Sequence, residues 1–119
     1  NQFANEPGSF ETVKQNYYNK YGVNFPIFAK LEVNGPYTHP VYKFLKRYSE
    51  LYNPKELRAE PIMQDFTKFL VDADGNVTGY YPRGTKVEVL AAEVKEIFEE
   101  RKKAAQVKTE LIKEATPRQ

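Results

Sequence analysis

The sequence predicts an α/β fold that is incomplete by itself and continues into a C-terminal helical extension. Two segments show helical spacing of apolar residues, one segment has the pattern of an apolar β-hairpin, and residues 87–115 contain neither Pro nor Gly. The predicted order is helix, extended segment, helix, hairpin, helix. An isolated hairpin is marginally stable in water, so we expect further strands from residues outside this sequence or from a neighbouring chain.

The first two helices are predicted from their ends and from the spacing between them. Ser9 is a good N-cap and Gly22 a good stop. The apolar positions between them share one helical face: Phe10, Val13, Tyr17 and Tyr21. Residues 24–33 are expected to be extended and to close in a turn at 34–36. Pro40 suits the first position of the second helix, which is expected to fade around Tyr52 into a loop.

The hairpin is predicted from two apolar runs, 66–71 and 76–81, which flank the turn residues Asp72, Asp74 and Gly75. These turn residues resemble the start of a calcium loop, but the other ligands do not follow, so a turn role is expected. The final helix is predicted from Val87 to Ala115, with Pro117 as its stop. In its second half an apolar stripe is expected to bind a protein partner: Ala104, Val107, Leu111, Ile112 and Ala115.

Composition excludes several function classes. With 40% hydrophobic and 29% charged residues, the chain has no apolar run near the ~20 residues of a membrane helix, and no membrane insertion is expected. The net charge is only +2, so no nucleic-acid partner is expected. The basic clusters 43–47 and 101–103 are interpreted as solvated helix faces. The chain contains no cysteine, hence no disulfide or thiol nucleophile within these residues, and no cofactor or metal is expected. His39, the single histidine, is expected to cap or turn the chain before Pro40.

Four long motifs occur in one order: NQF followed by EPGS, FPIFAKLEVNG, HPVYKFLK and FTKFLVDADGNVTGYYP. In these motifs residues 1–100 resemble the glutathione peroxidases, which have a thioredoxin-like fold. The resemblance implies that a central strand and the turn with the peroxidatic cysteine or selenocysteine would precede Asn1. We therefore expect a glutathione peroxidase-like domain over residues 1–100 without its N-terminal strands and nucleophile, followed by a helical extension over residues 101–119.

The resemblance also implies three positions that assist the nucleophile, and all three differ here. A glutamine before EPG corresponds to Asn5, and the Trp and Asn of a WNF motif correspond to Gln64 and Asp65. An ionised carboxylate only accepts hydrogen bonds, and at ~4 Å it would raise the pKa of a thiol by about one unit or more. The resolving cysteine of thioredoxin-dependent relatives falls where this chain has Tyr17 and Tyr18.

These changes favour a catalytically degenerate, glutathione peroxidase-like subunit that has a structural role in a larger assembly. We expect it inside the cell, with a mitochondrial assembly favoured. The alternative is a peroxidase dependent on glutathione or thioredoxin, with its catalytic segment outside these residues; glutathione is a partner only in that case. A third possibility is a thioredoxin-like binding module that senses peroxide through a partner's cysteine.

Overall fold

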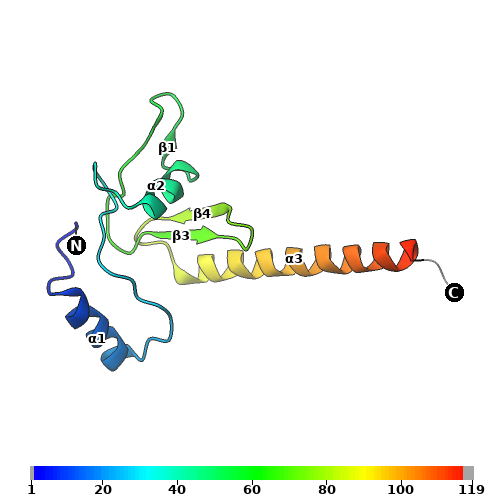
Figure 1. Cartoon of the computed structure of the whole chain (residues 1–119), viewed down its shortest axis with the longest axis horizontal. Helices are drawn as coiled ribbons and strands as arrows, with labels where there is room; N and C mark the ends of the chain where they lie inside the picture. The colour runs from blue at the N-terminus through cyan, green and yellow to red at the C-terminus, as the bar shows by residue number, and fades with distance from the viewer. Residues whose placement is uncertain (1, 117–119) are drawn as a thin grey trace. The chain divides into compact units, whose positions relative to one another are not determined.

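The structure is a computed structural model that describes residues 2–116, and it divides into two units, Asn1–Arg83 and Gly84–Gln119. The predicted domain boundary after residue 100 stays a prediction. The predicted helices and hairpin are present, together with one short strand pair (Figure 1). The elements are α1 (Phe10–Tyr21), α2 (Pro40–Arg47), β1 (Tyr52–Asn53), β2 (Arg58–Ala59), β3 (Lys68–Val71), β4 (Val77–Tyr81) and α3 (Val87–Ala115).

Helix α1 begins and ends at the two predicted caps. The Ser9 hydroxyl accepts a hydrogen bond from the Thr12 amide at 3.3 Å, which satisfies one of the free N–H groups of the first turn. Gly22 takes the left-handed conformation at φ 58° and donates its N–H to the Tyr18 carbonyl. A residue with a Cβ is disfavoured in that conformation, so Gly22 ends the helix.

Helix α2 starts as predicted but ends earlier than predicted. The His39 Nδ1 atom accepts from the Val41 amide at 3.1 Å, so the expected capping role of His39 is confirmed. The helix stops at Arg47, because the Ser49 hydroxyl donates to the Lys46 carbonyl and turns the chain. The predicted loop then contains the antiparallel pair β1–β2, in which Tyr52 is opposite Ala59.

The predicted hairpin is the antiparallel pair β3–β4, with a bulge between Leu70 and Val71. The Asp72 carboxylate accepts from the amides of Asp74 and Asn76, both at 2.9 Å, which confirms its turn role. On the sheet the Tyr81 ring lies so close over Gly79 that a Cβ at position 79 would collide with it.

Side-chain packing and two amides hold the first unit together. Tyr42 of α2 meets Phe69 of β3 edge to face, with ring centroids 6.1 Å apart. The Gln2 side chain accepts from the amides of residues 33 and 34 and donates to the Asn34 carbonyl at 2.9 Å. The Asn34 side chain in turn donates to the Ile62 carbonyl and accepts from the Ile62 amide. These two amides connect segments that are not paired as strands. The buried apolar residues of the unit are Val13, Ile62 and Tyr81, and the Asn34 amide bonds to the backbone of Ile62.

The second unit consists of α3, whose 29 residues confirm the predicted long helix. No residue of α3 falls in the buried class, including the predicted partner-binding residues Val107, Leu111, Ile112 and Ala115. Pro117, the predicted stop, lies outside the described residues. Within residues 2–116, no helix combines the length and the apolarity needed to cross a bilayer.

Candidate functional site

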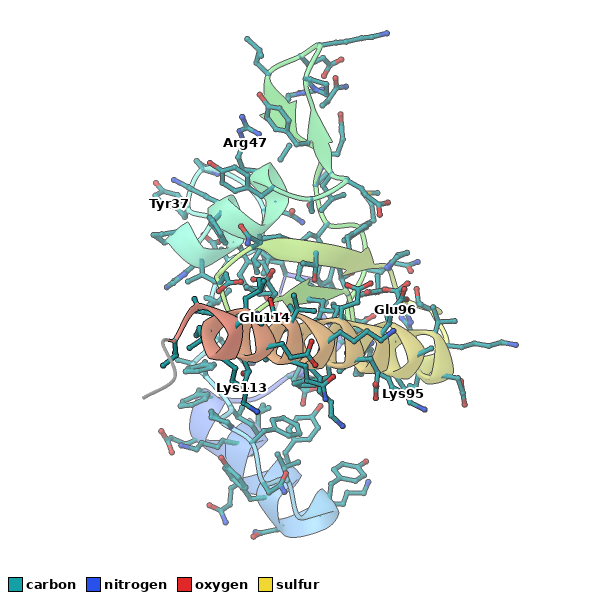
Figure 2. The ribbon with its side chains drawn as sticks, turned by 90° about the vertical axis from the view of Figure 1, so that its right-hand side faces the viewer. Tyr37, Arg47, Lys95, Glu96, Lys113 and Glu114 are labelled. Atoms are coloured by element: carbon teal, nitrogen blue, oxygen red, sulfur yellow. The ribbon has the colours of Figure 1, made fainter. Side chains whose placement is uncertain are left out.

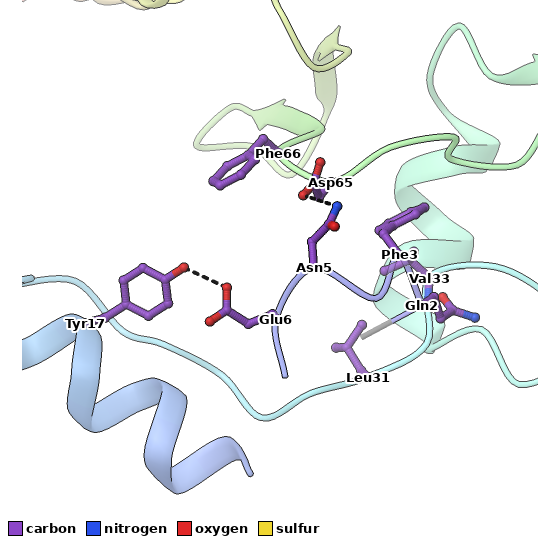
Figure 3. A pocket seen from close by; sticks show the side chains of 9 residues that line it. All are labelled: Gln2, Phe3, Asn5, Glu6, Tyr17, Leu31, Val33, Asp65 and Phe66. Atoms are coloured by element: carbon purple, nitrogen blue, oxygen red, sulfur yellow. Dashed lines mark hydrogen bonds between the residues drawn. The ribbon is translucent and has the colours of Figure 1, made fainter. Parts of the chain in front are cut away.

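A cavity of the first unit lies where the sequence placed two of its three site positions. Its volume is about 300 Å³, and it opens between the N-terminal segment, α1, the stretch before residue 34 and the turn before β3 (Figure 3). The wall contains both polar and apolar side chains. Its residues are Gln2, Phe3, Asn5, Glu6, Tyr17, Leu31, Val33, Asp65 and Phe66.

Asp65 is the centre of a polar cluster in this wall. The Asn5 Nδ2 atom donates to Asp65 Oδ2 at 2.8 Å, and Arg83 Nη1 donates to Asp65 Oδ1 at 2.8 Å. The Asp65 side chain is 20% exposed and the Arg83 side chain 52% exposed. Both carboxylate oxygens are therefore engaged, and the guanidinium offsets the negative charge. An Asp65 carboxylate without a partner would suppress a thiolate, but in the structure Asp65 forms an ion pair with Arg83.

The backbone next to both partners of this cluster is in the left-handed region. Ala4 has φ 56° and Phe66 has φ 57°, and they directly adjoin Asn5 and Asp65. A residue with a Cβ held in this conformation costs of order 1–2 kcal/mol. Strain of this kind is maintained by surrounding contacts and gathers at functional sites, which supports a function for this wall.

Tyr17 forms the second polar contact of the cavity. Its hydroxyl donates to Glu6 Oε2 at 3.0 Å, and this hydrogen bond, with burial and the charge of Glu6, raises the pKa of Tyr17 above 10.0 (Figure 3). The phenol is thus kept protonated as a donor. Tyr18, the neighbouring candidate, donates instead to the Phe25 carbonyl at 3.4 Å and does not line the cavity.

The third predicted position, Gln64, is not part of the cavity wall. Its side chain is exposed, and its carbonyl accepts from the Thr67 hydroxyl at 2.8 Å. The structure therefore joins Asn5 to Asp65 and leaves Gln64 apart. Sequence reasoning missed Arg83 and the Tyr17–Glu6 contact, because partners this far apart along the chain leave no periodic signal. Among residues 2–116, no group of three His, Cys, Asp or Glu side chains could hold a metal ion.

Comparison with known proteins places these motifs in one family. The family model described as glutathione peroxidase matches residues 1–46. The hydroperoxy fatty acid reductase of Synechocystis is 42% identical over 100 residues, which are 82% of this chain and 59% of that protein. The glutathione peroxidase-like peroxiredoxin of Schizosaccharomyces pombe is 42% identical over 99 residues, 82% of this chain and 60% of that protein.

A plant relative and a solved structure extend the comparison. The chloroplastic phospholipid hydroperoxide glutathione peroxidase of Pisum sativum is 45% identical over 86 residues, 71% of this chain and 34% of that protein. The crystal structure of Trgpx in its apo form superposes with a TM-score of 0.52 at 29% identity. The superposition covers 79% of this chain and 70% of the other chain. This match confirms the predicted α/β class with an incomplete thioredoxin-like fold.

These relatives correct the functional interpretation drawn from the sequence. They are named as reductases, peroxiredoxins and peroxidases, so the interpretation of this chain as a catalytically degenerate structural subunit is wrong. The three altered positions do not by themselves indicate a loss of activity, because the charge introduced at Asp65 is offset by Arg83. The chain spans about three-fifths of the length of the first two relatives, at 59% and 60%. Its motifs, its fold and its relatives together show that the chain belongs to the glutathione peroxidase family.

Proposed function

We propose that this protein is a thiol-dependent peroxidase that reduces organic hydroperoxides, and that the described residues form one wall of its active site. The single observation that carries the proposal is the Asp65–Arg83 ion pair beside the cavity. The names of the relatives point to the same chemistry. The nucleophile would come from residues outside this sequence, since these 119 residues contain no cysteine.

The proposed reaction needs a thiolate, or a selenolate, at the cavity. The anion attacks the terminal peroxide oxygen, the O–O bond breaks, and the products are a sulfenic (or selenenic) acid and an alcohol after one proton is taken up. A first reductant thiol then displaces water to give a mixed disulfide, and a second releases the nucleophile with formation of the reductant disulfide. Each turnover thus consumes two thiol groups, from glutathione or from a thioredoxin-type dithiol.

The ion pair makes the wall compatible with this anion. A lone carboxylate 4 Å from a thiolate would oppose it by about 4 kcal/mol at an effective dielectric near 20. Arg83 contacts Asp65 at 2.8 Å, so the two charges act on a nearby group as a dipole and largely cancel. The Asn5 amide contributes no charge and holds the second carboxylate oxygen in place.

The apolar residues of the wall favour a hydrophobic substrate. Leu31, Val33 and Phe66 line the same cavity as the polar cluster and suit an acyl chain better than hydrogen peroxide. The corresponding words in the relatives' names are hydroperoxy fatty acid and phospholipid hydroperoxide. We therefore propose fatty acyl hydroperoxides as the preferred substrate class.

Coupled assays on the full-length protein test this function. Consumption of NADPH is followed with glutathione and glutathione reductase, and separately with thioredoxin and its reductase, using linoleic acid hydroperoxide or hydrogen peroxide. We expect turnover with at least one reductant and a higher kcat/KM for the lipid hydroperoxide. Phe66→Ser should reduce that preference, whereas Phe28→Ser, an equally apolar change outside the cavity wall, should leave it unchanged. Turnover no faster than free thiol with both reductants would overturn the proposal.

A further inference from the structure

A second cavity of the first unit lies between α2 and the β1–β2 hairpin and is not part of the site described above. Its volume is about 270 Å³. We call it the Lys46 pocket, and it is lined by Gly35, Thr38, Lys43, Lys46, Arg47, Tyr52, Leu57, Arg58 and Ala59. Four of these residues are cationic, and no lining residue is acidic. The pocket therefore has a strongly positive wall.

Lys46 is the least expected of these cations. Its interpretation as part of a solvated helix face is wrong, because the residue is only 8% exposed. Its ammonium group donates to the Val33 carbonyl at 3.3 Å and to Asn34 Oδ1 at 3.1 Å, and both acceptors are neutral. Within residues 2–116 no carboxylate lies within ion-pair distance of it. Burial lowers its pKa, because the charged form has lost water without gaining a counterion.

The other three cations of the pocket have N–H groups that are available to bind a ligand. The Arg47 guanidinium stacks on the Tyr52 ring, 3.8 Å from its centroid, which orients its planar face. Figure 2 shows this side chain projecting from α2 on the side of the β1–β2 hairpin. Arg58 uses Nε for its bond to Glu56 at 2.6 Å, and its two terminal nitrogens have no acceptor among the described residues. Lys43 and Arg47 make no ion pair within residues 2–116.

We propose that the Lys46 pocket binds a phosphate group, either as free phosphate or as a small phosphomonoester. Four cations against the one carboxylate of Glu56 call for a ligand with more than one negative charge. A phosphate dianion supplies this charge and offers several acceptor oxygens to guanidinium and ammonium donors. The volume lies below the usual ~300–1,000 Å³ of pockets for larger ligands, which suits a small anion.

The bound anion would add a link between two elements of the first unit. Lys43, Lys46 and Arg47 come from α2, whereas Arg58 comes from β2, so one phosphate would bridge the helix and the hairpin. This site is separate from the proposed peroxide site, since no residue lines both cavities. Phosphate binding would therefore act on stability rather than on the peroxidase reaction itself.

Calorimetric titration of the full-length protein with inorganic phosphate at constant ionic strength tests this inference. We expect saturable binding, and at least about a tenfold weaker Kd for the double variant Lys43→Gln, Arg47→Gln. Both side chains are exposed, so this variant should fold. Lys102→Gln, Lys103→Gln on α3 removes the same charge outside the pocket and should leave the Kd unchanged.

Two further arms make the result decisive. Asn34→Asp places a carboxylate beside Lys46 and should weaken phosphate binding as much as the double variant does. Because this change also removes the donor to the Ile62 carbonyl, circular dichroism first checks that the variant is folded. Titration with glycerol 3-phosphate and with phosphatidic acid vesicles, against phosphatidylcholine vesicles, separates a free phosphomonoester from a lipid headgroup. No saturable phosphate binding by the wild type, an equal Kd in the Lys43/Arg47 variant, or an equal response to chloride would overturn the proposal.

Discussion

Asp65 and Lys46 are two charged side chains of the same unit that are treated in opposite ways. Asp65 is 20% exposed and has its own counterion, Arg83, at 2.8 Å. Lys46 is 8% exposed and meets only neutral oxygens. An asparagine completes each cluster, Asn5 as a donor to the carboxylate and Asn34 as an acceptor from the ammonium. A charge that is paired with a counterion of the protein produces only a small electrostatic field nearby. A buried charge without a counterion favours the binding of a ligand that supplies the opposite charge.

The largest expected effect on stability is at Asn34, because this side chain serves both the Lys46 cluster and the backbone of Ile62. Asn34→Ala removes its bonds to the Ile62 amide at 2.8 Å, to the Ile62 carbonyl and to Lys46. Because buried polar groups are left without partners, we expect a loss of about 3 kcal/mol in the free energy of unfolding. Urea denaturation of the full-length protein measures it, with the exposed Asn24→Ala as the matched control. Equal losses in the two variants would show that Asn34 is not the junction described here.

A smaller effect on the free energy of unfolding is expected at Arg83, the counterion of Asp65. Arg83→Gln leaves the carboxylate of Asp65 without its counterion, and we expect a loss of about 1 kcal/mol because the guanidinium is half exposed. Adding Asp65→Asn should recover most of that loss. The exposed pair Arg58–Glu56, with side chains 67% and 50% exposed, provides the control, and Arg58→Gln should change stability by less than about 0.5 kcal/mol. Additive effects of the Asp65 and Arg83 changes would mean that the two side chains do not interact in solution.

Tyr17 gives a third, pH-dependent effect. Its folded-state pKa is raised above 10.0, chiefly by the bond to Glu6, so its contribution is fully present below pH 10 and is lost as the pH rises through the folded-state pKa. Tyr17→Phe should cost about 0.5–1 kcal/mol at neutral pH and should flatten the loss of stability above pH 10. Tyr37→Phe provides the control, because Tyr37 is 80% exposed. Stability is measured by chemical denaturation across this pH range. The same pH profile in both variants would contradict the Tyr17–Glu6 hydrogen bond.

The smallest effect on stability is expected in α3, where the predicted interface lies. We propose that Val107, Leu111, Ile112 and Ala115 bind a protein partner, and Leu111 is already 60% exposed. Leu111→Asp should leave the unfolding transition nearly unchanged and release the partner in co-purification at equal expression. Gln106→Asp, on the opposite helical face, should retain it. Retention by both variants would show that the stripe is not an interface.

The elements that could be predicted are those whose signals are local in the sequence. The caps Ser9, Gly22 and His39 act on neighbouring residues, and Asp72 turns the hairpin through amides within four positions of it. The pair β1–β2 could not be predicted, because strands of two residues carry no alternation.

The candidate site was predicted in part, for a related reason. Asn5 and Asp65 were located through the family motifs, but the contact of Asp65 with Arg83 joins residues 18 positions apart and depends on the tertiary fold. The burial of Lys46 likewise depends on residues 33 and 34, which approach α2 only in the folded chain. Because the sequence does not reveal the contact between Asp65 and Arg83, the carboxylate of Asp65 was interpreted as a loss of activity.

The pKa of the peroxidatic thiol or selenol in the full-length protein tests the central claim most directly. It is measured from the ultraviolet absorbance of the thiolate or selenolate across a pH titration, in the wild type, in Arg83→Gln and in the double variant Arg83→Gln, Asp65→Asn. If Arg83 offsets Asp65, the single variant should raise this pKa by about one unit or more, and the double variant should return it to the wild-type value. An unchanged pKa in Arg83→Gln would contradict the account, because Asp65 would then have no influence on the nucleophile.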